Sequence, residues 1–290
     1  METICCFGAS VTEQKFGYAR CLKEYLPDYN ITIYGYGSHC LQNAGILYID
    51  DIIKTKPQYC ILDFFVVGSR DFVDDIECLN TILYKLSTIN CKCIIPFFLC
   101  INANNSGEFY YDKIKSYLEK YDVYYIDFKN YLTFSNDLIR DDVHTTELGG
   151  KKYAEIISNL LLKDKNKIII PNINLESQTY SNIQKYNLDK EVELNENEHM
   201  EIELDKPYKY LFIVMIIGPH TGIITINEKE YTNWDIYCHY NRTATRKFCL
   251  NSSNIKIVQT SKLFDTSYCR RDIDFTKYKK KLHIKEIYFY

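Results

Sequence analysis

The first 163 residues alternate between two hydrophobic periods, and this alternation limits the possible folds more than any other feature of the chain. Apolar runs of strand length recur and are almost continuous, which is typical of parallel strands buried on both faces. Between them, apolar residues recur at helical spacing, as at Phe16, Ala19, Leu22 and Leu26. The predicted strands are 3–7, 31–35, 59–67, 93–99 and 122–128, and the predicted helices are 12–26, 41–53, 72–87, 110–120 and 147–162.

Alternating strands and helices indicate βαβ units with right-handed crossovers and a parallel sheet that helices cover on both faces. Five such strands predict a flavodoxin-like three-layer α/β domain over residues 1–163. In sheets of this kind, ligands bind outside the carboxyl ends of the strands. The loops that follow the predicted strands are therefore where a functional site is expected.

The pattern changes near residue 164, where a polar stretch with a proline and no helical stripe predicts a linker over 164–175. Beyond it come short segments of alternating polarity, separated by turn residues such as those in "IGPHTG" and "LNSSN". This arrangement is typical of an antiparallel sandwich or barrel. We therefore expect a second, all-β, sandwich-like domain over 176–290.

Composition and charge exclude several partners. The net charge is −3, so no basic excess favours nucleic acid or an anionic membrane. The longest late apolar run, 210–218, is far shorter than the roughly 20 residues that span a bilayer.

The 12 cysteines, with no secretory signal pattern at the start, favour reduced thiols and a cytoplasmic location. No CxxC spacing occurs, so neither a metal site nor a cofactor is expected.

Ser10 lies between the first predicted strand and the first predicted helix, in "CCFGASVTEQ". A serine there is expected at the carboxyl edge of the sheet, beside the free N–H groups and partial positive charge of a helix N-terminus. Ser10 or Thr12 also fits a helix cap, because Glu13 follows three residues after Ser10, as in a capping box. Both interpretations are open from this stretch alone.

The stretch "RDDVHTTELGG" places Asp141 three residues before His144, just ahead of the last helix of the α/β domain. A nucleophilic serine needs a base, and the base needs a carboxylate that fixes its tautomer. One short turn would supply both, although Asp142 is an adjacent candidate for the carboxylate. Alternatively, the histidine is an exposed residue near a helix that Thr145 or Thr146 caps.

Two glycines follow the second and third predicted strands, Gly37 in "YGYGSH" and Gly68 in "VVGSRDF". Glycine lets a ligand approach the backbone closely, so the Gly37 N–H is a candidate donor to an oxyanion. Both glycines also fit ordinary tight turns after a strand.

Taken in order, these stretches resemble the SGNH, or GDSL-like, hydrolase family over about residues 1–163. "FGASVT" is similar to the family's nucleophile block, with Ser10 at the nucleophile and Ala9 where the family has aspartate. "GYGSH" resembles the second block, with Gly37 at the oxyanion glycine. "DDVH" matches the last block at Asp141 and His144, and "VVGSRDF" resembles the third.

The third block departs from the family at Arg70, which aligns with an asparagine whose amide completes the oxyanion hole. Arginine can donate hydrogen bonds and adds a positive charge. Arg70 therefore either replaces the amide or binds an anionic group of the substrate. Otherwise the third donor comes from a residue such as Ser69 or Asn43, or catalysis is impaired.

The resemblance implies acyl transfer in two steps through Ser10, His144 and Asp141, with Gly37 and Arg70 at the oxyanion or substrate. It implies an esterase acting on a small-molecule or glycan ester, most readily on the O-acetyl groups of a carbohydrate. Two alternatives are an O-acetyltransferase in cytoplasmic glycan biosynthesis and a catalytically impaired, glycan-binding relic of the fold.

The second predicted domain holds an aromatic cluster in "EYTNWDIYCHYNRT". Aromatic rings beside polar groups suit stacking on sugars, and they equally suit packing inside a sandwich or against the first domain. The cluster comprises Tyr231, Trp234, Tyr237, His239, Tyr240 and Arg242.

Overall fold

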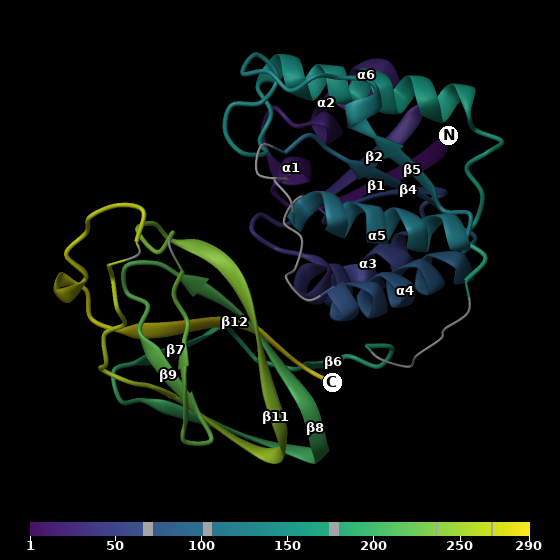
Figure 1. Ribbon diagram of the computed structural model, residues 1–290. Helices are drawn as coiled ribbons and strands as arrows, with labels where there is room; N and C mark the ends of the chain where they lie inside the picture. Colours follow the sequence, from purple (N-terminus) through teal and green to yellow (C-terminus); the bar gives the residue numbers. More distant parts are fainter. Residues whose placement is uncertain (66–71, 101–105, 174–179, 236, 268) are drawn as a thin grey trace. The chain divides into compact units, whose positions relative to one another are not determined.

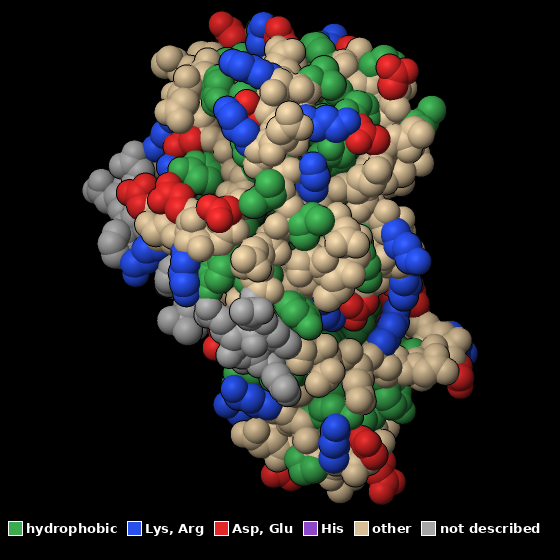
Figure 2. Space-filling view, turned by 90° about the vertical axis from the view of Figure 1, so that its right-hand side faces the viewer, with side chains coloured by type: hydrophobic (Ala, Val, Ile, Leu, Met, Phe, Trp, Pro, Cys, Tyr) green, Lys and Arg blue, Asp and Glu red, His purple; other side chains and the backbone are tan. Residues whose placement is uncertain are grey.

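The computed structural model describes residues 1–65, 72–100, 106–173, 180–235, 237–267 and 269–290. The chain divides into two compact units, Met1–Ser181 and Asn182–Tyr290, which are taken in turn (Figure 1). No helix in the described ranges is long and apolar enough to cross a membrane. On the face in Figure 2, acidic and basic side chains are interspersed, in keeping with the small net charge.

The first unit is built on a five-stranded sheet in the order β2-β1-β3-β4-β5. Each neighbouring pair is parallel, which confirms the predicted parallel sheet. The carboxyl ends of the strands therefore share one edge of the sheet. The strands are β1 (Glu2–Gly8), β2 (Tyr29–Gly35), β3 (Tyr59–Asp63), β4 (Lys92–Phe97) and β5 (Tyr124–Asp127).

Helices cover both faces of this sheet, so the three-layer architecture is also confirmed. Figure 1 shows α2 and α6 on one side and α3, α4 and α5 on the other. The helices are α1 (Ser10–Glu13), α2 (Tyr18–Tyr25), α3 (Ile46–Thr55), α4 (Phe72–Thr88), α5 (Ser106–Lys120) and α6 (Glu147–Lys163). Two shorter turns complete the unit, the π-helical η1 (Leu41–Gly45) and the 3-10 helical η2 (Phe128–Asn130).

The apolar runs predicted to be strands form the core between the layers. Cys5, Cys6, Cys60 and Cys93 are fully buried within these strands and act there as small apolar side chains. Each of the 12 cysteines is a free thiol.

One sequence prediction was wrong in detail. The helix predicted over 12–26 is two helices, because the chain turns between α1 and α2 at Gly17. A Cβ added at Gly17 would lie 2.5 Å from the Val11 carbonyl oxygen, so the turn admits only glycine. Phe16, predicted on the buried face, lies in this turn with 42% of its surface exposed.

The second unit is all-β, as predicted, and forms one seven-stranded antiparallel sheet. Its order is β10-β9-β11-β8-β12-β6, and β7 also pairs with β12. The two longest strands contain register shifts, and apolar side chains from most of the strands gather in one core. The strands are β6 (Gln184–Tyr186), β7 (Val192–Asn195), β8 (His199–Ile217), β9 (Ile223–Ile226), β10 (Lys229–Thr232), β11 (Arg242–Gln259) and β12 (Lys281–Phe289), with a 3-10 turn η3 (Phe275–Lys277) before β12.

Candidate active site

Ser10 is the first residue of α1, at the carboxyl edge of the sheet where β1 ends. Ala9 is the N-cap, and α1 has no side-chain cap, so the capping-box interpretation of Ser10 and Glu13 was wrong. Ser10 is half-buried. Among the described residues, no acceptor takes a hydrogen bond from its backbone N–H, which leaves this donor free for a ligand.

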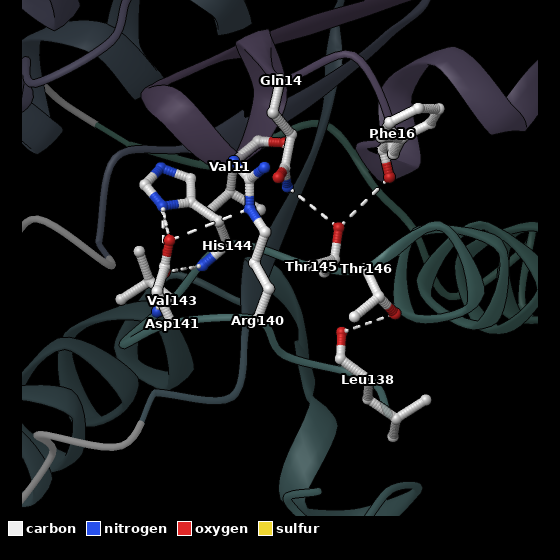
Figure 3. A network of polar contacts seen from close by, with 10 residues as sticks. All are labelled: Val11, Gln14, Phe16, Leu138, Arg140, Asp141, Val143, His144, Thr145 and Thr146. Carbon is white, nitrogen blue, oxygen red and sulfur yellow. Dashed lines mark hydrogen bonds and ion pairs between the residues drawn. The ribbon is translucent and has the colours of Figure 1, made fainter. Parts of the chain in front are cut away.

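The Asp141 carboxylate and the His144 ring form a hydrogen-bonded pair. Nδ1 of His144 lies 3.0 Å from Oδ1 and 2.9 Å from Oδ2 of Asp141. The backbone N–H groups of Val143 and His144 also donate to Oδ1, at 3.0 and 2.8 Å. The carboxylate therefore fixes the ring so that Nε2 points away from Asp141 (Figure 3). Asp142, the alternative partner, makes no such contact with the ring among the described residues.

The surroundings of Asp141 favour its ionised form. Partial burial acts to raise the pKa of the carboxyl, but the backbone donors of Val143 and His144 and the His144 side chain outweigh it and lower the pKa. Arg140 adds a weak ion pair, with Nε 3.8 Å from Oδ2. A carboxylate that stays charged can hold one tautomer of the imidazole and stabilise its protonated form.

The loop with His144 is tied to the segment that carries Ser10. Thr145 accepts a hydrogen bond from Gln14 Nε2 at 3.0 Å and donates to the Phe16 carbonyl oxygen at 3.2 Å (Figure 3). Ile139 pairs with Thr145 in an isolated bridge, so residues 139–145 form a closed turn. The structure thus attaches the two candidate catalytic segments through side chains next to each of them.

The start of α6 packs against the turn after α1 and against the loop before His144. Thr146 caps the helix by accepting a hydrogen bond from the Gly149 N–H at 3.1 Å. A Cβ added at Gly150 would lie 1.9 Å from the Phe16 carbonyl oxygen, and one at Gly149 would lie 2.0 Å from that of Leu138. The two glycines therefore let α6 touch both the turn after α1 and the loop before His144.

Gly37 lies in a tight turn after β2. The His39 N–H donates to the Tyr36 carbonyl at 3.3 Å, and Ser38 adopts a left-handed φ of 62°. Among the described residues, the N–H groups of Gly37 and Ser38 have no acceptor, so both are free to bind an anion. A Cβ on Gly37 would lie 2.3 Å from Glu13 Oε2, because the Glu13 carboxylate packs against this glycine.

The third oxyanion donor remains a prediction. Arg70 and Ser69 lie outside the described residues. Asn43 is described, and its Oδ1 accepts hydrogen bonds from the N–H groups of Cys40 and Ala44, at 2.6 and 2.7 Å. These two bonds fix the Asn43 amide within η1.

Ser10 and His144 are thus on tied segments at one edge of one sheet, and no hydrogen bond joins their side chains in the described parts of the chain. Catalytic hydrogen bonds are often long in ligand-free enzymes and tighten with substrate. No group of three or more His, Cys, Asp or Glu side chains in the described ranges is arranged to hold a metal ion.

Neither a family model nor a curated protein matches this sequence. Solved structures do match the fold. The crystal structure of a two-domain esterase active on acetylated mannans, CEX, co-crystallised with mannopentaose, aligns with a TM-score of 0.73 at 12% identity. The alignment covers 99% of this chain and 90% of that one. A second structure of CEX gives a TM-score of 0.72 at 11% identity over the same shares of the two chains.

A putative lipolytic protein of the G-D-S-L family from Desulfitobacterium hafniense DCB-2 aligns with a TM-score of 0.50 at 14% identity. It covers 56% of this chain and 100% of its own. This chain therefore has the fold of a two-domain esterase. The likeness to a G-D-S-L protein agrees with the resemblance drawn from the sequence blocks of the first unit.

The aromatic cluster of the second unit is divided between two roles. Trp234 stacks on Phe264, with ring centroids 4.5 Å apart, and Tyr231 meets Phe248 edge-on within the core. Arg242 pairs with Asp235. His239 and Tyr240 line an open groove of about 680 Å³. Packing or an ion pair therefore accounts for Tyr231, Trp234 and Arg242, while His239 and Tyr240 face the groove.

Four further residues contact the candidate site, and the sequence motifs assigned none of them to it. Gln14 donates a hydrogen bond to Thr145 in the His144 loop, and the Glu13 carboxylate packs against Gly37. The Thr12 hydroxyl donates to the Asp63 carboxylate. Asp63 did carry a signal, since a lone carboxylate in a predicted fully buried strand requires a specific partner.

Proposed function

We propose that this protein is a serine esterase that removes O-acyl groups, above all acetyl groups, from a carbohydrate. The observation that carries the proposal is the Asp141–His144 pair on a loop that Gln14 and Thr145 tie to the start of α1. A serine at a helix N-terminus with a free N–H, beside an oriented histidine, is suited to nucleophilic attack on an ester.

In the first step, His144 Nε2 accepts the proton of the Ser10 hydroxyl while Oγ attacks the ester carbonyl. The tetrahedral intermediate collapses when His144 returns that proton to the leaving alcohol, which gives an acyl-serine. In the second step, His144 takes a proton from water, the hydroxide attacks the acyl-serine, and the carboxylic acid leaves as Ser10 regains its proton. Asp141 holds the imidazole and stabilises its charged form throughout.

The oxyanion formed in each step would be held by the N–H of Ser10 and by those of the Gly37 turn. These groups are suited to the task because they have no acceptor among the described residues. Removing one such donor typically costs about 3–4 kcal/mol of transition-state stabilisation.

The first experiment asks whether Ser10 is the nucleophile. Hydrolysis of p-nitrophenyl acetate and labelling by a fluorophosphonate are compared for the wild type, Ser10→Ala and His144→Ala. His283→Ala is a matched control, because His283 has similar exposure and pairs with Glu191 in the second unit. We expect both His144→Ala and Ser10→Ala to abolish turnover and labelling, and His283→Ala to retain them. Unchanged hydrolysis in Ser10→Ala would overturn the proposal.

The carbohydrate part of the proposal is supported by the similar two-domain esterase, which is active on acetylated mannans. Acetate release from acetylated mannan and from acetylated xylan, measured against Ser10→Ala, tests it. Release from neither polymer, with retained hydrolysis of the nitrophenyl ester, would leave an esterase of a different substrate class. Acetyl transfer from acetyl-CoA only in the presence of an acceptor sugar would favour the acetyltransferase instead.

A further inference from the structure

Three buried polar side chains next to the turn that carries Ser10 are joined by hydrogen bonds. None of them takes part in the two steps of the proposed hydrolysis. Thr12 Oγ1 is 2.8 Å from Asp63 Oδ2 and 2.9 Å from the Tyr18 hydroxyl. Thr12, Asp63 and Tyr18 each have no exposed surface. They come from three different elements, α1, the end of β3 and α2.

The direction of these hydrogen bonds follows from the number of protons. The Thr12 hydroxyl has one proton, and Asp63 accepts it. Thr12 must then accept the proton of the Tyr18 hydroxyl. The chain runs from Tyr18 through Thr12 to Asp63, and it leaves Asp63 Oδ1 buried without a partner among the described residues.

Asp63 holds both sides of the Ser10 turn. Its backbone carbonyl accepts a hydrogen bond from the Ala9 N–H at 2.6 Å, one residue before Ser10. Its side chain accepts from Thr12, two residues after Ser10. The residues on both sides of Ser10 are therefore anchored to the end of β3.

The glycine before this turn has a steric reason to be there. A Cβ added at Gly8 would lie 2.3 Å from Thr12 Oγ1 and 2.4 Å from the Asp63 carbonyl oxygen. Any side chain at Gly8 would displace the very groups that make the two hydrogen bonds. The cluster is thus packed as one piece with the end of β1.

We propose that Asp63, linked through Thr12, is the positioning residue that aims Ser10 at the substrate. It touches neither the substrate nor the reacting atoms and acts through α1. The proposal rests on the esterase function proposed above, because it assigns Asp63 to the same nucleophile.

Burial of Asp63 favours its neutral acid form. The titratable side chains that face it are Cys6 from β1, Tyr18 from α2, Tyr111 from α5 and Tyr153 from α6, which are uncharged near neutral pH. Burial raises the pKa of Asp63 to about 7, although the hydrogen bonds with Thr12 act to lower it.

The experiment compares Thr12→Val, which keeps the shape but loses the hydroxyl, with Thr12→Ser, which keeps the hydroxyl. Thr81→Val is the matched control, because Thr81 is an equally buried threonine of the first unit, in α4. Two readouts are taken, kcat and KM for p-nitrophenyl acetate, and hydrogen exchange of the amides of residues 12 and 13, which donate to the Ala9 carbonyl.

We expect Thr12→Val to lower kcat about 10- to 100-fold with KM within about twofold, because a small displacement of a nucleophile is costly. Thr12→Ser should recover most of this loss. Exchange of the amides of residues 12 and 13 should be at least about tenfold faster in Thr12→Val than in Thr12→Ser or Thr81→Val. Equal kcat in Thr12→Val and the wild type, or no rescue by serine, would overturn the proposal.

The exchange measurement separates failure of this proposal from failure of the esterase function. If the wild type and Ser10→Ala hydrolyse esters equally, the esterase function fails, and exchange still shows whether Thr12 and Asp63 hold the turn. If Ser10→Ala is inactive while Thr12→Val exchanges and turns over like Thr81→Val, only the positioning role is wrong.

Discussion

Gln14 Nε2 donates to Thr145 Oγ1 at 3.0 Å, so a residue just after α1 is bonded to the neighbour of His144. The two residues are 131 positions apart in the chain. The bond connects the end of α1, the helix that begins with Ser10, to the loop that holds His144. It is partly buried, and Gln14 also reaches the Val11 carbonyl at 3.3 Å.

Removing the hydrogen bond between Gln14 and Thr145 should lower kcat. Thr145→Val loses the contacts with Gln14 and with the Phe16 carbonyl, while Thr145→Ser keeps both. We expect Thr145→Val to lower kcat about 10-fold, since a shift of the His144 loop lengthens the path of the proton. Steady-state kinetics on p-nitrophenyl acetate check this. Equal rates in the valine and serine variants would show that the bond does not position His144.

Replacing Asp141 tests which carboxylate orients the histidine. Asp141→Asn keeps the shape but presents an amide to Nδ1, which favours the wrong tautomer. Because about half of the Asp141 side chain is exposed, we expect kcat/KM to fall about 10- to 1000-fold, less than for a fully buried partner. The control is Asp142→Asn, which should stay within about twofold of the wild type. A larger loss in Asp142→Asn would reverse the assignment.

The sheet of the first unit could be predicted because its strands are continuously apolar, and their period does not depend on distant contacts. The break between α1 and α2 could not, because the apolar stripe continues through Phe16 while a backbone contact at Gly17 ends the helix. Helical periodicity reports which face is apolar and is insensitive to a close approach between two backbone segments.

The residues of the candidate site also fall into two groups, those that the sequence could predict and those that only the structure shows. Ser10, Asp141 and His144 could be predicted as candidates because each lies in a short motif at an element boundary. Gln14, Thr12 and Asp63 were not, because each acts through a partner more than 50 residues away in the chain. Sequence spacing carries no record of such pairs, so the supporting contacts of the site had to come from the structure.

Gly150 should tolerate no side chain, because α6 touches the turn after α1 at this residue. In Gly150→Ala the new Cβ would meet the Phe16 carbonyl oxygen at 1.9 Å, and backbone cannot yield as a flexible side chain does. We expect a loss of about 2–4 kcal/mol in the free energy of unfolding, together with reduced kcat. Urea unfolding and steady-state kinetics measure both.

Gly45→Ala provides the comparison for this prediction. Its Cβ would lie 3.3 Å from Ile82 Cδ1, the end of a side chain that can move. We expect a change within about 1 kcal/mol, because a single methyl contact can relax and a residue less flexible than glycine gains helix propensity. Similar losses in both variants would mean that the contact of Gly150 with Phe16 is not the reason for glycine there.

The last prediction concerns how stability depends on pH through Asp63. Its pKa is raised in the folded state to about 7, above the ordinary value of 3.8 that applies on unfolding. The folded state therefore binds the proton more tightly, and the stability that this contributes is fully present below about pH 4. It is lost as pH rises through about 7, with a slope of up to about 1.4 kcal/mol per pH unit.

Asp63→Asn removes this titration and keeps an acceptor for Thr12. Between about pH 4.5 and 7, we expect the wild type to lose stability relative to the variant, and the difference between the two curves to flatten above pH 7. Urea unfolding of the two proteins across this range measures the difference, and carboxyls elsewhere cancel because both proteins contain them. A difference that is constant with pH would show that Asp63 is ionised throughout. It would then be a buried carboxylate whose charge the hydrogen bonds with Thr12 stabilise more than burial opposes it.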